Sequence, residues 1–282
     1  PKQIFNLFPS CQILRFNKQL FIFNNKNYYT VQDFIHKFIY HSSFEFIQES
    51  TIINKFDSMN KQFDILLLVF IGNETIGIEL INKIIKYKKI QKKFNVSFCI
   101  TSSLMHSEKM KMLIKNNFEF FSIYISNEYG NDIIPTMLMY DMIQQKYNFT
   151  HIIKLHTKSI KYQFDNLTDF LLSHPIEKLI THPITDSNCI GYQYKPLYTD
   201  NFNRDSIQKF DHYLNRNFSF VPGTIFYTQK VIMDKVLFLI KNENYRSFLL
   251  NNLYDDNSIN KHYSPIHFLE RLFGVINLNT IK

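Results

Sequence analysis

Apolar runs alternate with segments of helical periodicity from about residue 63 onward. Residues 65–70 are continuously apolar and end before Gly72-Asn73, a pattern typical of a strand buried on both faces. Residues 75–89 follow with apolar positions at helical spacing. The same succession recurs along the chain, with further strands expected at residues 96–100, 120–125 and 151–155, and further helices ending near residue 116 and spanning 135–146.

This alternation predicts a series of βαβ units. The expected fold class is therefore α/β, with a Rossmann-type, mostly parallel sheet and helices on both faces. Such sheets bind ligands beyond the carboxyl ends of their strands. The segments in that position are residues 72–74, 101–103, 127–132 and 156–158, and all four are polar or small, as a binding site requires.

The pattern is less regular at both ends of the chain. We expect helices at residues 170–180, 231–240 and 264–273, a short strand at 189–192, and a strand at 218–227 that Pro222-Gly223 interrupts. In the first sixty residues we expect strands near 13–16 and 20–23 and a helix near 31–40. The chain is accordingly divided into an N-terminal extension of unassigned role, residues 1–61, and a main domain, residues 62–282.

Composition and charge narrow the choice of partners. The 282 residues carry a formal net charge of +8, which favours anionic partners such as nucleic acid, an acidic membrane or a nucleotide diphosphate. Many lysines fall in residues 86–93 and 109–115, although such a run is usually a solvated helix face. Because no recognised nucleic-acid-binding motif accompanies the lysines, nucleic acid is the least favoured of these partners.

The cysteines and the hydropathy pattern indicate which cellular compartment the protein occupies and whether it crosses a membrane. Cys11, Cys99 and Cys189 form no CxxC motif, so neither a zinc site nor a disulfide framework is expected, and a reducing, cytoplasmic compartment is the natural inference. No apolar run approaches the ~20 residues that cross a bilayer, so no transmembrane segment is expected, while peripheral contact with a membrane stays open. Because the sequence begins with Pro1 rather than methionine, we expect it to be part of a longer protein.

Two strand ends hold candidate site residues. His156 and Lys158 close the fourth strand, where they either meet a phosphate group or are simply solvated. Asp132 lies three positions before Pro135 at a helix start, so it either caps that helix or faces a ligand. Gly130 permits backbone conformations that other residues avoid.

Two further segments carry possible chemistry. Gly223 and Thr224 interrupt a strand, which marks either a bulge or a close backbone approach to a ligand. His267 shares a helix face with Glu270 and Arg271, which form either a surface ion pair or part of a site. No dinucleotide-binding glycine motif, Walker loop, Gly-x-Ser-x-Gly or His-Glu-x-x-His motif occurs.

Four of these segments, in this order, resemble the rhamnan synthesis F family of glycosyltransferases. The resemblance spans residues 63–276. The sequence departs from the family pattern at Asn131, where the family has arginine, and by one residue inserted before Gly130. The matching segments are Asn127-x-x-Gly130-x-Asp132-Ile133-x-Pro135, Lys154-Leu155-His156-Thr157-Lys158, Phe220-Val221-Pro222-Gly223-Thr224-Ile225-Phe226-Tyr227 and His267-x-x-Glu270-Arg271-Leu272-Phe273-Gly274.

The resemblance implies a GT-A-like fold, a nucleotide-diphosphate sugar donor, and transfer to a hydroxyl group of a glycan, lipid-linked or protein acceptor in polysaccharide or glycoconjugate assembly. Glu270, otherwise Asp255 or Asp256, is the expected general base if the reaction inverts the anomeric centre. His267 and Arg271 are expected as further site residues. The residues expected to bind the donor are Asn73, Asn127, Gly130, Asp132, His156, Lys158, Gly223 and Thr224.

The end of the fourth strand departs from many nucleotide-sugar transferases, which carry Asp-x-Asp there to hold a divalent metal. The basic side chains of His156 and Lys158 could take the place of that metal, so no metal ligands are assigned, although other carboxylates could still hold one. The alternative to an enzyme is a catalytically inactive nucleotide- or carbohydrate-binding domain of a larger assembly protein.

Overall fold

The structure is a computed structural model. It describes residues 65–90, 94–101, 104, 107–118, 121–126, 132–144, 148–158, 160–181, 186–197, 211–241 and 265–278, together with the strand backbones at 12–16, 19–24, 27–30 and 53–54.

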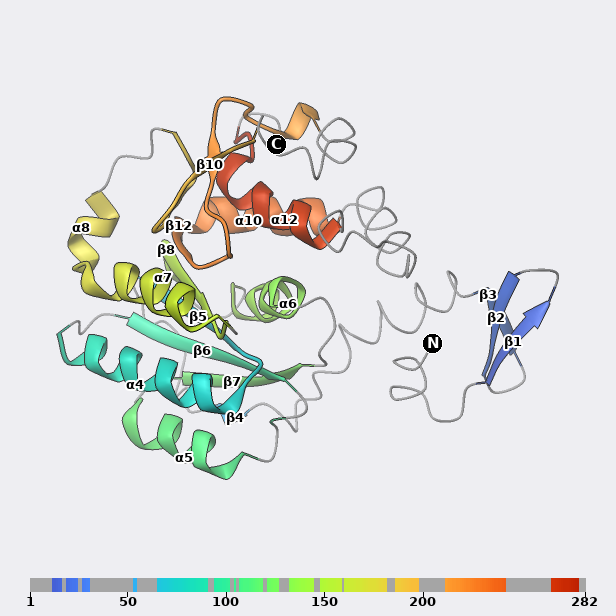
Figure 1. Cartoon of the computed structure of the whole chain (residues 1–282), viewed down its shortest axis with the longest axis horizontal. Coiled ribbons are helices and arrows are strands. Elements are labelled where there is room, and N and C mark those ends of the chain that lie inside the picture. The colour runs from blue at the N-terminus through green and yellow to red at the C-terminus, as the bar shows by residue number, and fades with distance from the viewer. Residues whose placement is uncertain are drawn as a thin grey trace.

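A seven-stranded mixed sheet in the order β4-β7-β6-β5-β8-β12-β9 forms the centre of the main domain (Figure 1). Its four middle strands are parallel, as the βαβ pattern predicts, whereas β4, β12 and β9 run antiparallel to their neighbours. The strands are β4 (Ile53–Asn54), β5 (Ile65–Ile71), β6 (Phe94–Thr101), β7 (Phe121–Ser126), β8 (His151–His156), β9 (Cys189–Ile190) and β12 (Phe226–Gln229).

Helices cover both faces of this sheet, which confirms an α/β architecture. Every residue of β5 is buried, and alternate residues face two different apolar clusters, because successive side chains of a strand point to opposite faces. The helices of one cluster are α4 (Glu74–Ile90), α5 (Glu108–Asn117), α7 (Lys161–Ser173) and α8 (Ile176–Thr181), and those of the other are α6 (Ile133–Gln144), α10 (Lys230–Lys241) and α12 (Pro265–Val275).

Smaller elements complete the described structure. Strands β1 (Gln12–Phe16), β2 (Gln19–Asn24) and β3 (Asn27–Thr30) form a separate antiparallel sheet, which confirms the two strands expected there, while the helix expected at 31–40 lies outside the described residues. The edge strand β4 lies within the range assigned to the extension, so the main sheet takes in residues that precede 62. A two-stranded ladder joins β10 (Lys195–Pro196) to β11 (Ser219–Phe220), and a 3-10 turn spans Asp211–Tyr213.

The helix expected at residues 170–180 is wrong in its bounds. The chain instead forms α7, which begins at Lys161, and α8, with a break at His174-Pro175. Proline lacks a backbone N–H and disfavours helical geometry in the residue before it, which explains the break. No helix in the described part of the chain combines the length and apolar character that a membrane span needs.

Gly274 sets how closely α12 approaches β11. A Cβ atom added at this glycine would lie 2.5 Å from Phe220 Cα and 2.6 Å from the Ser219 carbonyl oxygen. Both are backbone atoms that cannot rotate away, so the helix and strand can pack at this distance only with glycine here.

We therefore expect Gly274→Ala to lower the free energy of unfolding by about 1–3 kcal/mol, measured by urea denaturation, because overpacking outweighs alanine's better helix propensity. Asn82→Ala, on the exposed face of α4, is the control and should be neutral or slightly stabilising. A Gly274→Ala protein as stable as the wild type would contradict this account of the packing.

Candidate functional site

The topology brings two predicted segments together. Strand β8 pairs with β12 in antiparallel register, with Lys154 opposite Phe226. The residues that precede β12 therefore lie beside the residues that follow Lys154. As a result Gly223 and Thr224 meet His156 at the carboxyl end of β8.

The backbone of this turn adopts an unusual conformation. Gly223 has φ of +88° and Thr224 has φ of +54°. A left-handed conformation is ordinary for glycine but rare for a β-branched residue, at a cost of about 1–3 kcal/mol. Such strain persists only where the surroundings over-determine the conformation.

Asp132 and Lys154 hold Thr224 in place. The Lys154 ammonium donates to the Thr224 carbonyl oxygen at 3.0 Å and to the Asp132 carboxylate. The Thr224 hydroxyl donates to Asp132 Oδ2 at 2.7 Å. Lys154 is fully buried, so its charge depends on this carboxylate for compensation. The carboxylate of Asp132 thus serves the turn, while its carbonyl oxygen accepts the Thr136 N–H at the start of α6.

His156 and Glu270 hold Gly223. Nε2 of His156 lies 2.6 Å from the Gly223 carbonyl oxygen, and Nδ1 lies 2.9 Å from the Thr157 carbonyl oxygen. The Gly223 N–H donates to Glu270 Oε1. Glu270 Oε2 accepts from Arg271 at 2.7 Å, and both of these side chains are largely buried. These contacts place Glu270 and His156 against the turn, with both ring nitrogens of His156 directed at backbone oxygens.

The charges of this group shift two pKa values. Burial disfavours the carboxylate of Asp132, but the charge that His156 carries at acidic pH, the charge of Lys154, and the hydrogen bonds from Lys154 and Thr224 outweigh it and hold the pKa well below its usual value. Burial lowers the pKa of His156, and the neighbouring Asp132 carboxylate only partly opposes that effect. The ion pair is therefore charged near neutral pH, while burial favours the neutral imidazole, which can donate to only one of its two neighbouring carbonyl oxygens.

Lys158 occupies a different position from the other polar residues. A Cβ atom added at Gly223 would lie 2.6 Å from its Nζ and 3.4 Å from Leu167 Cδ1, so the glycine makes room for the ammonium group. Lys158 is half-buried, and no described residue forms a hydrogen bond or ion pair with it. Among the described residues its charge is therefore uncompensated, which suits the side chain to contact with an anion.

Helix α7 begins three residues after Lys158. Its N-cap residue is Ile160, which supplies no side-chain hydrogen bond to the first N–H groups of the helix, and its first turn has no acidic residue. Polar N-cap residues normally satisfy such groups. The side chain of the N-cap residue therefore leaves the positive end of the helix dipole uncapped, at a point that follows Lys158 closely in the sequence.

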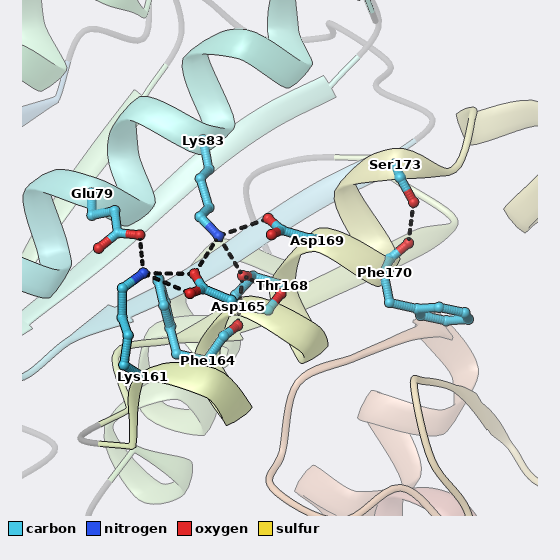
Figure 2. A network of polar contacts seen from close by, with 9 residues as sticks. All are labelled: Glu79, Lys83, Lys161, Phe164, Asp165, Thr168, Asp169, Phe170 and Ser173. Carbon is cyan, nitrogen blue, oxygen red and sulfur yellow. Dashed lines mark hydrogen bonds and ion pairs between the residues drawn. The ribbon is translucent and has the colours of Figure 1, made fainter.

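A network of ion pairs fixes α7 on α4 (Figure 2). Lys83 of α4 reaches both Asp165 and Asp169 of α7 at 2.7 Å, and Lys161 pairs with Glu79 and Asp165. The pairs are partly exposed, so each contributes little by itself. Their combined effect is to fix the start of the helix that follows the Lys158 segment.

The remaining predicted residues divide into two groups. Asn73 Oδ1 accepts the Ile76 N–H at 3.0 Å, so the contact it makes is that of an N-cap for α4. Arg271, besides its ion pair, lies with its guanidinium carbon 4.8 Å from the centre of the Phe220 ring. Asn127, Gly130, Asp255, Asp256 and the side chain of His267 lie outside the described residues.

Lys154 belongs to this group, although it was not among the predicted site residues. It stands inside the apolar run Ile152-Ile153-Lys154-Leu155, and that position was its one signal, because an unpaired lysine is almost never fully buried. Within the described residues no group of three or more His, Cys, Asp or Glu side chains is arranged to hold a metal ion. Searches against protein-family models, curated proteins and solved structures found no match.

The lowered pKa of Asp132 predicts an acid-labile contribution to stability. Because the folded pKa lies below the unfolded value of about 3.9, this contribution is present above about pH 4 and is lost as the pH falls further. We expect Asp132→Asn to cost about 3–5 kcal/mol at neutral pH, because it leaves the buried Lys154 charge uncompensated. Measured by urea denaturation between about pH 3 and pH 7, the free energy of unfolding of the variant should also fall less toward acidic pH than that of the wild type. The double variant Asp132→Asn, Lys154→Met should recover part of the lost stability. If Asp132→Asn loses stability toward acidic pH as steeply as the wild type does, Asp132 is not the cause of that loss.

The lowered pKa of His156 predicts that the stability of the fold also depends on pH in a second, higher range. Its folded pKa lies below the unfolded value of about 6.5, so the unfolded chain binds the proton more readily and stability falls as the pH drops below about 6.5. We expect His156→Gln, which can still donate to the Gly223 carbonyl, to reduce the loss of stability between about pH 7 and pH 5. The measurement is the urea midpoint across this range, and equal slopes for variant and wild type would rule out His156 as the cause.

Proposed function

We propose that the chain is a glycosyltransferase with a GT-A-type domain, which moves a sugar from a nucleotide-diphosphate donor to a hydroxyl group of an acceptor. The observation that carries this proposal is the available ammonium group of Lys158 beside Gly223, at the carboxyl end of β8 and just before the uncapped start of α7. A cation near a helix N-terminus at this edge of an α/β sheet is suited to a phosphate group.

The arrangement of the four resembling segments supports the same proposal. Asp132, Lys154, Thr224 and Glu270 come one from each of these segments, and all belong to the hydrogen-bonded group around the turn. Four unrelated short matches would give no reason for their side chains to gather around one strained backbone turn. The resemblance to the rhamnan synthesis F family is thus supported by spatial arrangement as well as by order.

The contacts divide the roles among these residues. In this proposal Lys158 offsets negative charge on the departing diphosphate. His156 and Glu270 act on the turn, because the ring nitrogens of His156 lie at carbonyl oxygens and both oxygens of Glu270 already accept hydrogen bonds. The general base for the acceptor is then assigned to Asp255 or Asp256 in preference to Glu270.

A second candidate is a catalytically inactive nucleotide- or carbohydrate-binding domain. It is favoured by the engagement of Asp132 and Glu270, because both carboxylates of the described site serve the turn and neither is free to take a proton from an acceptor. Turnover separates the two candidates, since an inactive domain binds the nucleotide without breaking the sugar–phosphate bond.

The test of the phosphate site is Lys158→Ala. Titration calorimetry with UDP, GDP, CDP and dTDP should find one that binds the wild type, and the variant should bind it about 10- to 100-fold more weakly, as expected for the loss of a charged contact worth about 1.5–3 kcal/mol. Lys178→Ala, which removes an exposed lysine of α8, is the control and should leave affinity unchanged. Equal affinity in Lys158→Ala, or no binding of any of the four nucleotides, would count against the proposal.

The same protein is then incubated with the matching nucleotide sugars, and released nucleotide is measured with and without a chelator. Release from at least one donor supports the transferase, whereas binding without release supports the inactive domain. Activity that disappears in the chelator would assign part of the charge compensation to a divalent metal.

A further inference from the structure

The positive charge of the chain is concentrated in one stretch. Between residues 86 and 115 the sequence holds eight lysines and one acidic residue, Glu108, so this stretch carries +7 of the formal net charge of +8. It comprises the last turn of α4, strand β6 and helix α5. Elsewhere the chain is close to charge balance, so any general affinity for anions is expected to reside here.

Helix α5 displays its lysines around an apolar residue. Lys109, Met112 and Lys115 follow one another at three-residue spacing on the side opposite the buried Met110 and Ile114. Met112 is 58% exposed, and the two lysines are exposed on either side of it. Within the described part of the chain neither lysine has an ion-pair partner, so both charges face solvent without compensation.

Helix α4 packs beside α5. Both helices follow parallel neighbouring strands and so run in the same direction, and Gly77 near the start of α4 approaches Met110 near the start of α5. Lys86 is exposed on the solvent side of α4. We call the surface of α5 formed by Lys109, Met112 and Lys115 the basic face.

We infer that the basic face binds the surface of an anionic lipid membrane. Lysines attract acidic headgroups at close range, and an exposed apolar side chain between them can enter the boundary between headgroups and acyl chains. This is contact with the membrane surface, and it does not depend on the proposed glycosyltransferase activity.

Two features favour lipid over nucleic acid as the partner. Residues 86–115 contain no arginine, the side chain that most often reads guanine bases. Tyr87 and Phe98 of this stretch are buried, so neither ring can stack on a base. The exposed side chain of Met112, by contrast, can be buried between the headgroups and acyl chains of a lipid surface.

The test uses co-sedimentation of the whole chain with vesicles of phosphatidylcholine alone and of phosphatidylcholine with phosphatidylglycerol. The wild type is expected to bind the anionic vesicles and not the neutral ones. Lys109→Glu with Lys115→Glu should lower the partition coefficient by at least roughly 30-fold, because each lysine near the surface contributes about a fivefold effect. Met112→Ser should lower it by roughly fivefold through loss of apolar burial.

The matched control is Lys178→Glu with Lys195→Glu. These lysines are exposed on α8 and on β10, which pairs with β11 outside the main sheet, and their reversal changes the net charge by the same amount. Binding close to that of the wild type supports the basic face, and circular dichroism confirms that each variant is folded. Equal loss in both double variants would mean a general charge effect and would overturn the inference. The inference would also be overturned if the wild type did not bind the anionic vesicles. It would likewise be overturned if the wild type bound a single-stranded oligonucleotide more tightly than the vesicles and Met112→Ser left that binding unchanged.

Discussion

A left-handed threonine held by a buried ion pair is the constraint on which the candidate site depends. Thr224 would relax to an ordinary backbone conformation if Asp132 and Lys154 did not bond both its hydroxyl and its carbonyl oxygen. The pair in turn is stable only because each member compensates the other's charge away from water. The strained conformation of Thr224 and the buried pair of Asp132 and Lys154 are therefore found together.

This constraint explains the distribution of charge around the turn. Lys154 is matched by Asp132, Arg271 is matched by Glu270, and burial favours the neutral form of His156. Among the described residues of the turn, Lys158 alone keeps an uncompensated charge. The groups that shape the turn thus contribute almost no net charge, and the attraction for an anion is left to a side chain that is not needed to hold the turn.

The sequence predicted the parallel strands well and the contacts within the site only in part. Residues 65–70 form a continuous apolar run because β5 is buried on both faces, and that signal is local. The start of α7 was missed, although Phe164, Leu167, Thr168 and Leu171 have helical spacing. The role of Lys154 could not be predicted from local pattern, because its burial depends on an antiparallel register with β12 that only the tertiary structure sets.

The net charge at the turn also limits what the described residues can bind by themselves. Lys158 supplies one positive charge, and an uncapped helix N-terminus adds the equivalent of about half a charge. A nucleoside diphosphate is more negative than this sum, so under the proposed function further positive groups or N–H donors must reach the donor. Residues 127–131 directly precede Asp132 in the sequence and lie outside the described residues, and in the resembling family the place of Asn131 is held by arginine. Under the proposed function, we expect this sequence segment to contact the donor through backbone N–H groups, where the family pattern has a guanidinium group.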